Sequence, residues 1–254
     1  MNIETRSGNF TNSQIYKIAA KPSRGNKDFL ASGETYIKER WLERLLLDKL
    51  QEDGYSRAKA WGKFMEAYLF CNKLGTEYKI SSQSSIRHPD EFLGLYWAGT
   101  TDFEVGGKEP MISEAKCYYK KNFALYSMAI IHARETDNPS YLKENHPEEY
   151  WQIVGNTILN GVDYGEAICF MPTYDDLEEI REYAEDPMWI EANKLGPMWH
   201  YRFLYEEPKE NLQLLNPKSK IPSINKYRFL VPVEDKEYLT SRVELSIDKL
   251  EELL

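Results

Sequence analysis

The stretch from Trp97 to Lys116 constrains the fold more than any other part of the chain, because it has the pattern of a β-hairpin. Two short apolar runs flank the sequence GGKEP at residues 106–110, and this composition is typical of a tight connection between strands. With these residues as the loop, Val105 lies opposite Met111. The pairing of the other residues in both strands follows from that register.

Two carboxylates fall opposite each other in this register. Counting outward from the loop places Asp102 across from Glu114, and side chains alternate along a strand, so Lys116 shares their face. Carboxylates roughly 5 Å apart on neighbouring strands repel each other unless a positive charge lies between them. A divalent metal ion with a nearby ammonium group meets this need. A solvated polar face on an edge hairpin is the alternative.

Length and composition indicate one soluble domain. The 254 residues suffice for one substantial core, with or without an insertion. No apolar run is long enough for a transmembrane helix, and residues 1–10 lack the pattern of a signal peptide. Three cysteines show neither paired metal-site spacing nor an even disulfide count. We therefore expect a cytoplasmic protein with no membrane partner.

The net charge of -9 argues at first against a nucleic-acid partner, but the charge is unevenly distributed. Residues 1–60 contain 11 Lys and Arg against 8 Asp and Glu, whereas residues 173–211 contain 4 against 11. The acidity is thus concentrated late in the chain and need not face the hairpin. A metal-binding acidic cluster would also lower the net charge without excluding DNA.

Residues 6–19 have the pattern of a loop that enters a helix. Thr11 and Gln14 form a capping-box pair before an apolar face. A helix N-terminus with free backbone amides, preceded by Arg6 and including Ser13, can hold a phosphate group. An ordinary capped helix with a surface arginine is the alternative.

Helical periodicity marks two further helices before the hairpin. The first, from about Glu34 to Gln51, carries an apolar stripe that we expect in the core, formed by Tyr36, Trp41, Leu45, Leu46 and Leu50. The second, from about Ser56 to Leu74, turns inward Trp61, Met65, Tyr68 and Leu69. Glu66 lies at the margin of this second face, where it is either solvated or directed into a shared polar cavity.

The order of elements predicts a single α/β (α+β) domain over residues 1–254. After the hairpin, helices are expected near residues 123–134 and 147–160, with a loop between them, then a strand at 166–171. A last strand at 227–233 precedes a terminal helix whose apolar face comprises Leu239, Val243, Ile247, Leu250 and Leu254. The acidic, aromatic and proline-rich segment 173–220, with one expected helix at Asp175–Tyr183, is interpreted as an insertion before the last strand or an interaction surface.

Taken in order, the chain offers a helical Glu66, then Asp102, then Glu114-Ala115-Lys116, then a helical Gln152. This order resembles the PD-(D/E)xK nuclease superfamily, whose catalytic hairpin carries an acid on one strand and E-x-K on the next. Within it, the chain resembles the phage lambda exonuclease and YqaJ-like viral recombinase family over most of residues 1–172 and again around 227–254. The pieces that carry the resemblance are RSGNFTNSQIYKIAAKP (6–22), AWGKFME (60–66), TTDF (100–103), SEAKC (113–117) and YWQ (150–152).

The resemblance implies a restriction-endonuclease-like core, a central mixed sheet flanked by helices, and phosphodiester hydrolysis with two Mg²⁺ ions, for which Mn²⁺ can substitute. It implies catalytic roles for Glu66, Asp102, Glu114, Lys116 and Gln152. It implies metal ligation by Asp102, Glu114, the backbone carbonyl of Ala115, and Glu66 directly or through a water. Lys116 would orient and help deprotonate the attacking water, and Gln152 would hold Lys116 or the phosphate.

The same resemblance implies a 5′-to-3′ exonuclease that acts on double-stranded DNA ends in phage-type homologous recombination. Arg6, Thr11 and Ser13 would bind the terminal 5′-phosphate. Implied partners are DNA ends, two further copies of the chain in a homotrimer ring, and a single-strand-annealing protein. The chain departs from the family at Thr101, where proline is usual, and at Lys59, where an apolar wedge would help to split the duplex.

Two other functions stay open on the sequence. One is an endonuclease or a single-strand exonuclease built on the same core. The other is a non-catalytic protein that binds DNA ends.

Overall fold

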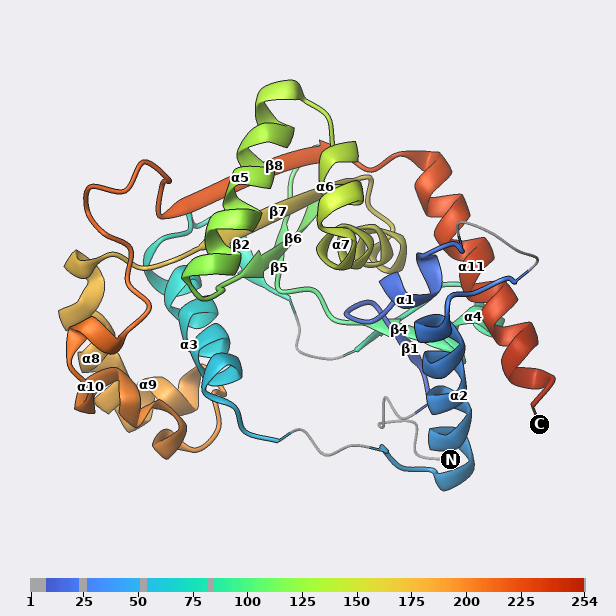
Figure 1. The fold of residues 1–254 in the computed structure, drawn as a ribbon, viewed down its shortest axis with the longest axis horizontal. Helices are drawn as coiled ribbons and strands as arrows, with labels where there is room; N and C mark the ends of the chain where they lie inside the picture. Colours follow the sequence, from blue (N-terminus) through green and yellow to red (C-terminus); the bar gives the residue numbers. More distant parts are fainter. Residues whose placement is uncertain (1–7, 23–26, 51–53, 82–84, 254) are drawn as a thin grey trace.

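The computed structural model describes residues 8–22, 27–50, 54–81 and 85–253. Two mixed β-sheets are flanked by helices (Figure 1), which confirms the predicted fold class. The larger sheet has the order β2 (Tyr78–Ile80), β5 (Phe103–Val105), β6 (Met111–Lys116), β7 (Tyr164–Phe170) and β8 (Ile224–Leu230). The smaller has the order β1 (Phe10–Thr11), β4 (Trp97–Gly99) and β3 (Ile86–Arg87).

The predicted hairpin is formed by β5 and β6, which pair antiparallel with Val105 opposite Met111. Strand β4, at the start of the predicted hairpin stretch, belongs instead to the smaller sheet, where it pairs with β1 and β3. Residues 100–102 therefore connect one sheet to the other, and Asp102 lies on this connection. On its other side, β6 pairs in parallel with β7.

Each face of the larger sheet has its own core, because side chains alternate along its strands. Ile112 and Ala167 lie in one core, whereas Ala115 and Ile168 lie in the other. The first core is covered by α1 (Tyr16–Ala19), α2 (Ala31–Leu46), α5 (Lys120–Thr136), α6 (Ser140–Asn145), α7 (Pro147–Asn160) and α11 (Val233–Glu251). The second is covered by α3 (Arg57–Asn72) and the segment that follows β7. The short helix α4 (Glu91–Gly94) precedes β4.

Helix α7 has the predicted bounds, with Pro147 at its first position and Gly161 after its end. Gly161 adopts φ +62°, a left-handed conformation that favours glycine. The neighbouring helix α6 lies where a loop was predicted. Its six residues span less than two helical turns, too few for helical periodicity to be visible in the sequence.

The segment 173–220 contains more helices than the single one predicted. They are η1 (Tyr174–Asp176), α8 (Leu177–Glu185), α9 (Pro187–Ala192), η2 (Met198–Tyr201), α10 (Arg202–Glu206) and η3 (Lys209–Asn211). Together they form a lobe beside α3, at the left of Figure 1. Apolar side chains of the lobe, such as Ile190 and Leu204, share a core with Phe64 of α3. We refer to residues 173–220 as the lateral lobe.

The predicted capping box at the start of the first helix is wrong. Helix α1 begins at Tyr16 and has no side-chain cap. Thr11 lies in β1, and its backbone carbonyl accepts the N–H of Gln14 at 2.9 Å. The segment is held by strand pairing, so its turn needs no side-chain cap.

The predicted burial of the leucines near the end of α2 is also wrong. Leu46 is 60% exposed, and Leu45 and Leu50 are exposed as well. The helix ends at Leu46, and its last buried position is occupied by Glu43, which accepts the backbone N–H of Gly8 at 2.8 Å. The buried face is therefore polar at this end of the helix, and the leucines point away from it. Leu254 lies outside the described residues.

None of the helices within the described ranges has the length and apolar composition that a bilayer-spanning helix requires.

The corrected burial of α2 can be tested with a pair of alanine substitutions. We expect Leu46→Ala to change the free energy of unfolding of the monomer by less than about 0.5 kcal/mol, because the side chain is exposed in the single chain. In contrast, Ile247→Ala in α11 removes a side chain that is 0% exposed and should cost about 2–5 kcal/mol. Urea denaturation of both variants measures the difference. Equal losses would contradict the described end of α2.

Candidate active site

Asp102 and Glu114 lie next to each other, as the hairpin register predicted. Asp102 Oδ2 accepts the backbone N–H of Ala115 at 2.8 Å, which fixes the carboxylate beside β6. Glu114 is 1% exposed and accepts two hydrogen bonds, from Gln152 Nε2 at 2.8 Å and from Asn156 Nδ2. Both donors come from α7, which packs on this face of the sheet. The strand pair sets the spacing of the acids, and α7 sets the orientation of Glu114.

Gln152 connects Lys116 to the acid pair. Lys116 Nζ donates to Gln152 Oε1 at 2.9 Å, and the same amide donates through Nε2 to Glu114. A carboxamide can do this because it carries an acceptor and a donor on one planar group. The amide therefore holds Lys116 and Glu114 in a fixed relation, from a helix that the chain reaches 36 residues after the lysine.

Glu66 joins these groups from the other side, on α3. Burial raises its pKa well above the usual value, the charge of Asp102 raises it further, and the charge of Lys116 lowers it. These charges act on Glu66 only because the three groups are close together. The five residues that were predicted to be catalytic thus converge on one place, where α3, the β5–β6 hairpin and α7 meet.

The cluster carries more negative than positive charge. Burial raises the pKa of Asp102, and burial together with the charge of Asp102 raises the pKa of Glu114 well above its usual value. Burial alone would lower the pKa of Lys116, but the charges of Glu114, Asp102 and Glu66 outweigh it and raise that pKa. The ammonium group of Lys116 acts on all three carboxyl groups, and that of Lys63 acts on Glu66 as well, but the pKa values of the acids stay raised, so the protein without metal favours protons on them.

The donor set fits a hard divalent cation. Within the described part of the chain, no three His, Cys, Asp or Glu side chains already surround a common point. The carboxylates of Asp102 and Glu114, the carbonyl of Ala115 and water would form an all-oxygen set, which Mg²⁺ prefers with several waters retained. A dication would also neutralise the excess negative charge of the cluster.

Two buried asparagines extend the site, and neither was predicted from the sequence. Asn156 Nδ2 donates to Glu114, and its Oδ1 accepts from Asn12 Nδ2 at 2.5 Å. Asn12 Oδ1 accepts the indole N–H of Trp97 at 2.7 Å. The position of Asn156, four residues after Gln152 on the same helix face, was the available signal. This chain of amides links the N-terminal segment to Glu114.

Two glycines make room for Asn12, which is 1% exposed. A Cβ atom at Gly99 would lie 2.4 Å from Asn12 Nδ2, and one at Gly155 would lie 2.5 Å from Asn12 Oδ1. Neither distance is tolerated between non-bonded heavy atoms, so β4 and α7 can approach Asn12 this closely only with glycine at these two positions. The buried position of Asn12 therefore depends on two glycines that lie far from it in the sequence.

The predicted phosphate-binding residues are described only in part. Ser13 is exposed, and its Oγ lies 3.5 Å from Thr11 Oγ1. Thr11 Oγ1 also lies 3.4 Å from the hydroxyl of Tyr36. Arg6 lies outside the described residues. The hydroxyls of Thr11 and Ser13 flank Asn12, so they lie on the segment that reaches Glu114 through Asn156.

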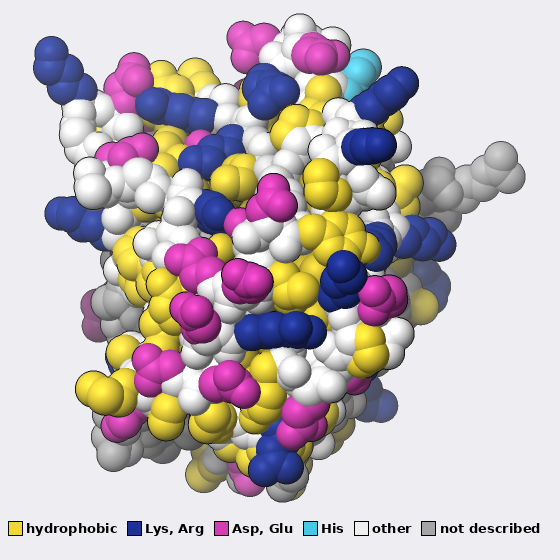
Figure 2. Space-filling model, turned by 90° about the vertical axis from the view of Figure 1, so that its left-hand side faces the viewer, with side chains coloured by type: hydrophobic (Ala, Val, Ile, Leu, Met, Phe, Trp, Pro, Cys, Tyr) yellow, Lys and Arg dark blue, Asp and Glu magenta, His cyan; other side chains and the backbone are white. Residues whose placement is uncertain are grey.

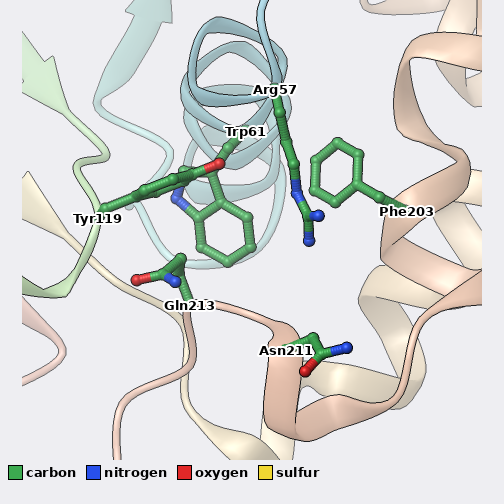
Figure 3. A pocket seen from close by; sticks show the side chains of 6 residues that line it. All are labelled: Arg57, Trp61, Tyr119, Phe203, Asn211 and Gln213. Atoms are coloured by element: carbon green, nitrogen blue, oxygen red, sulfur yellow. The ribbon is translucent and has the colours of Figure 1, made fainter.

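Two cavities lie beside α3. One, of about 300 Å³, has Glu66 in its wall together with Lys63 of α3 and Lys194 of the lateral lobe. The other, of about 250 Å³, contains none of the predicted site residues. Figure 3 shows Trp61 and Tyr119 on one side of it and Phe203 on the other, with Arg57 between them. Arg57 is already engaged there by the carboxylate of Glu207, at 2.7 and 2.6 Å.

The raised acid pKa values predict how stability depends on pH when no metal is bound. Native Glu66, Asp102 and Glu114 hold protons at pH values where the unfolded chain has lost them, so stability falls as pH rises through the native pKa values. Asp102→Asn removes one of these charges. In EDTA, the variant should be more stable than the parent at alkaline pH, and this gain should shrink toward about pH 4.

Thermal unfolding in EDTA across this pH range measures the effect. A variant that is less stable than the parent at alkaline pH would contradict the described charge balance.

No family model and no curated protein sequence matches the chain. Solved structures do. The alkaline exonuclease LHK-Exo from Laribacter hongkongensis aligns with a TM-score of 0.58 and 14% identity, over 97% of this chain and 89% of that one. LHK-Exo in complex with dAMP aligns with a TM-score of 0.57 and 15% identity, over the same shares of both chains. A phage-related exonuclease from Haemophilus somnus 129PT aligns with a TM-score of 0.56 and 14% identity, over 96% of this chain and 94% of that one.

These likenesses cover nearly the whole chain, from the N-terminal segment to the terminal helix, although few residues are identical. The chain therefore has the fold of phage-related and alkaline exonucleases, as the resemblance in its sequence predicted.

Proposed function

We propose that the protein is a Mg²⁺-dependent DNA exonuclease that hydrolyses phosphodiester bonds from the ends of double-stranded DNA. The observation that carries the proposal is the convergence of Glu66, Asp102, Glu114 and Lys116 in one charge-unbalanced cluster, held by Gln152. The fold supports it, since the similar solved proteins are exonucleases. One of them was solved with dAMP, a deoxynucleoside monophosphate of the kind that digestion of DNA releases.

In this proposal each residue has a defined task. Asp102, Glu114 and the Ala115 carbonyl hold one Mg²⁺ ion, and Glu66 binds a second, directly or through water. When bound, such ions would supply positive charge for the scissile phosphate, for ionisation of the attacking water and for the negative charge that develops on the leaving oxygen. Lys116 orients the attacking water, and Gln152 fixes the direction of its ammonium group. Mn²⁺ meets the same demands on geometry and ligand type.

The proposed role of Lys116 as a proton acceptor depends on the metal. Without metal, the carboxylates around Lys116 raise its pKa, so the ammonium form is favoured. Cations at Asp102 and Glu114 would offset that influence, and burial then favours the neutral amine. Lys116 would accept a proton only in a loaded site, which limits hydrolysis to the productive complex.

We also propose 5′-to-3′ polarity, with Arg6, Thr11 and Ser13 binding the terminal phosphate. The support is the amide chain from Asn12 through Asn156 to Glu114, which joins this segment to the cluster. A terminal phosphate bound by these residues would lie at a fixed distance from the scissile bond. The 5′-to-3′ direction would suit phage-type recombination, in which a single-strand-annealing protein takes up the exposed strand.

A homotrimer ring threaded by DNA is part of the same proposal. Its support is the exposed apolar surface at the end of α2, formed by Leu45, Leu46, Leu47 and Leu50. Contiguous exposed apolar side chains on soluble proteins often mark interaction surfaces. A ring would bury these leucines against a neighbouring copy.

Substitution of the central charges tests the proposed reaction. Lys116→Ala and Asp102→Asn should each abolish Mg²⁺-dependent digestion of linear duplex DNA, because each removes a group that acts at the scissile phosphate. Circular dichroism should show an intact fold in both variants. Retained activity in either variant would refute the site assignment.

The substrate form distinguishes the related functions. The parent should digest linear duplex and leave covalently closed circles intact, whereas an endonuclease would cut the circles. Digestion of single strands alone would indicate a trimming exonuclease. Failure to digest any DNA, with DNA ends still bound, would indicate a non-catalytic end-binding protein.

The amide chain generates a separate prediction. Asn156→Ala removes the donor that orients Glu114 and leaves every proposed ligand in place. We expect Mg²⁺ affinity to fall about 10- to 100-fold, as for other residues that orient metal ligands. Calorimetric titration with Mg²⁺ measures it, and Asn145→Ala on α6 is a matched control, because that amide bonds only the Tyr141 carbonyl in its own helix. An unchanged Mg²⁺ affinity in Asn156→Ala would rule out this orienting role.

A further inference from the structure

The lateral lobe reaches the catalytic cluster at one cavity. Glu66 and Lys63 of α3 form one side of this cavity of about 300 Å³, and Asn193, Lys194 and Leu195 of the lobe form another. The lobe is otherwise acidic, with 11 Asp and Glu against 4 Lys and Arg over residues 173–211. Figure 2 shows the side of the molecule on which the lobe lies, and acidic side chains run through the middle of it. A lysine beside a catalytic acid is thus an exception to the charge of its own segment.

The backbone at Lys194 is in a conformation that favours glycine. Its φ angle is +53°, in the left-handed region. The residue follows the C-cap of α9, and two hydrogen bonds form a Schellman motif, from Lys194 N to the Glu191 carbonyl at 2.9 Å and from Leu195 N to the Ile190 carbonyl at 3.1 Å. Leu195 and Ile190 lie together in the apolar core. Glycine would meet the needs of this position with less strain, so the turn itself gives no reason for a lysine.

The two lysines of the cavity are available to an anion. Among the described residues, neither Lys63 nor Lys194 forms a salt bridge. Lys194 and Lys63 are both exposed, and Lys63 lies one turn before Glu66 on α3. Two ammonium groups at the rim of a cavity that opens onto a nuclease-like cluster match a phosphodiester, which is anionic and binds lysine as a point charge.

We propose that Lys194 and Lys63 bind a backbone phosphate of the DNA strand next to the scissile phosphate, so that the lateral lobe supplies a positioning residue to the active site. The inference rests on the proposed nuclease function. It also assigns a task to the lobe, which holds Lys194 in place through the turn at the end of α9. The turn fixes the backbone of Lys194 before DNA binds.

The substitution Lys194→Gly tests the proposal, because it removes the charge and relieves the backbone conformation. Lys218→Gly is the matched control, since Lys218 is an exposed lysine of the same lobe outside the cavity. Both are made in an Asp102→Asn background and assayed in EDTA, so that DNA is bound without hydrolysis. The probe is a short linear duplex with 5′-phosphates, titrated by fluorescence anisotropy at several KCl concentrations.

We expect Lys194→Gly to weaken binding about fivefold at physiological salt and to lower the slope of log affinity against log salt by about one. The midpoint of thermal unfolding should stay the same or rise. Lys194→Arg should retain binding, and Lys218→Gly should match the background.

Unchanged affinity and slope in Lys194→Gly, or equal losses in Lys218→Gly, would overturn the proposal while leaving the nuclease function intact. If the background does not bind the duplex and the parent does not digest it with Mg²⁺, the proposed function itself has failed.

Discussion

The burial of three carboxyl groups in one cluster is the constraint on which the rest of the site depends. Burial raises the pKa values of Glu66, Asp102 and Glu114, the charge of Asp102 raises those of Glu66 and Glu114 further, and the ammonium group of Lys116 offsets this only in part. Such a cluster lowers the stability of the metal-free protein at neutral and alkaline pH. The fold tolerates it because the acids come from separate elements, each held by packing that does not involve the cluster. Two faces of one sheet and the helix on each face supply that packing.

The hydrogen bonds around the cluster orient the acids without neutralising their charge. Each donor to Glu114 is a carboxamide, which neutralises no charge and so leaves the acids able to attract a cation. A lysine or arginine in place of Gln152 or Asn156 would satisfy the same acceptor and remove the need for metal. The amides of α7 therefore set geometry without changing the charge, and Asn12 extends this arrangement to the N-terminal segment.

The hairpin register and α7 were predictable because local signals determine them. A loop of residues 106–110 fixes the pairing of Val105 with Met111, and Pro147 and Gly161 mark both ends of α7. The convergence of Glu66 with the hairpin followed from the order of motifs, since nothing local places α3 beside β6. Asn12 was missed because a hydrogen bond across 144 residues leaves no pattern in one sequence, whereas for Asn156 the four-residue spacing from Gln152 was a signal. The leucines of α2 were misplaced because periodicity gives a stripe but not the residue at which the helix ends.

Lys194 illustrates a signal of a different kind. From the sequence, its segment was characterised mainly by an acidic composition. Composition gives no information on where an individual lysine lies in the fold. In the structure, a Schellman turn with a buried Leu195 directs the chain back toward α3 and places Lys194 in the wall of the Glu66 cavity. Glycine or asparagine is the usual residue in a left-handed backbone, but Leu47 and Asp137 adopt the same conformation, so the turn permits a lysine without requiring one. The proposed use of its charge, at the rim of the Glu66 cavity, is to bind an anion, which DNA supplies.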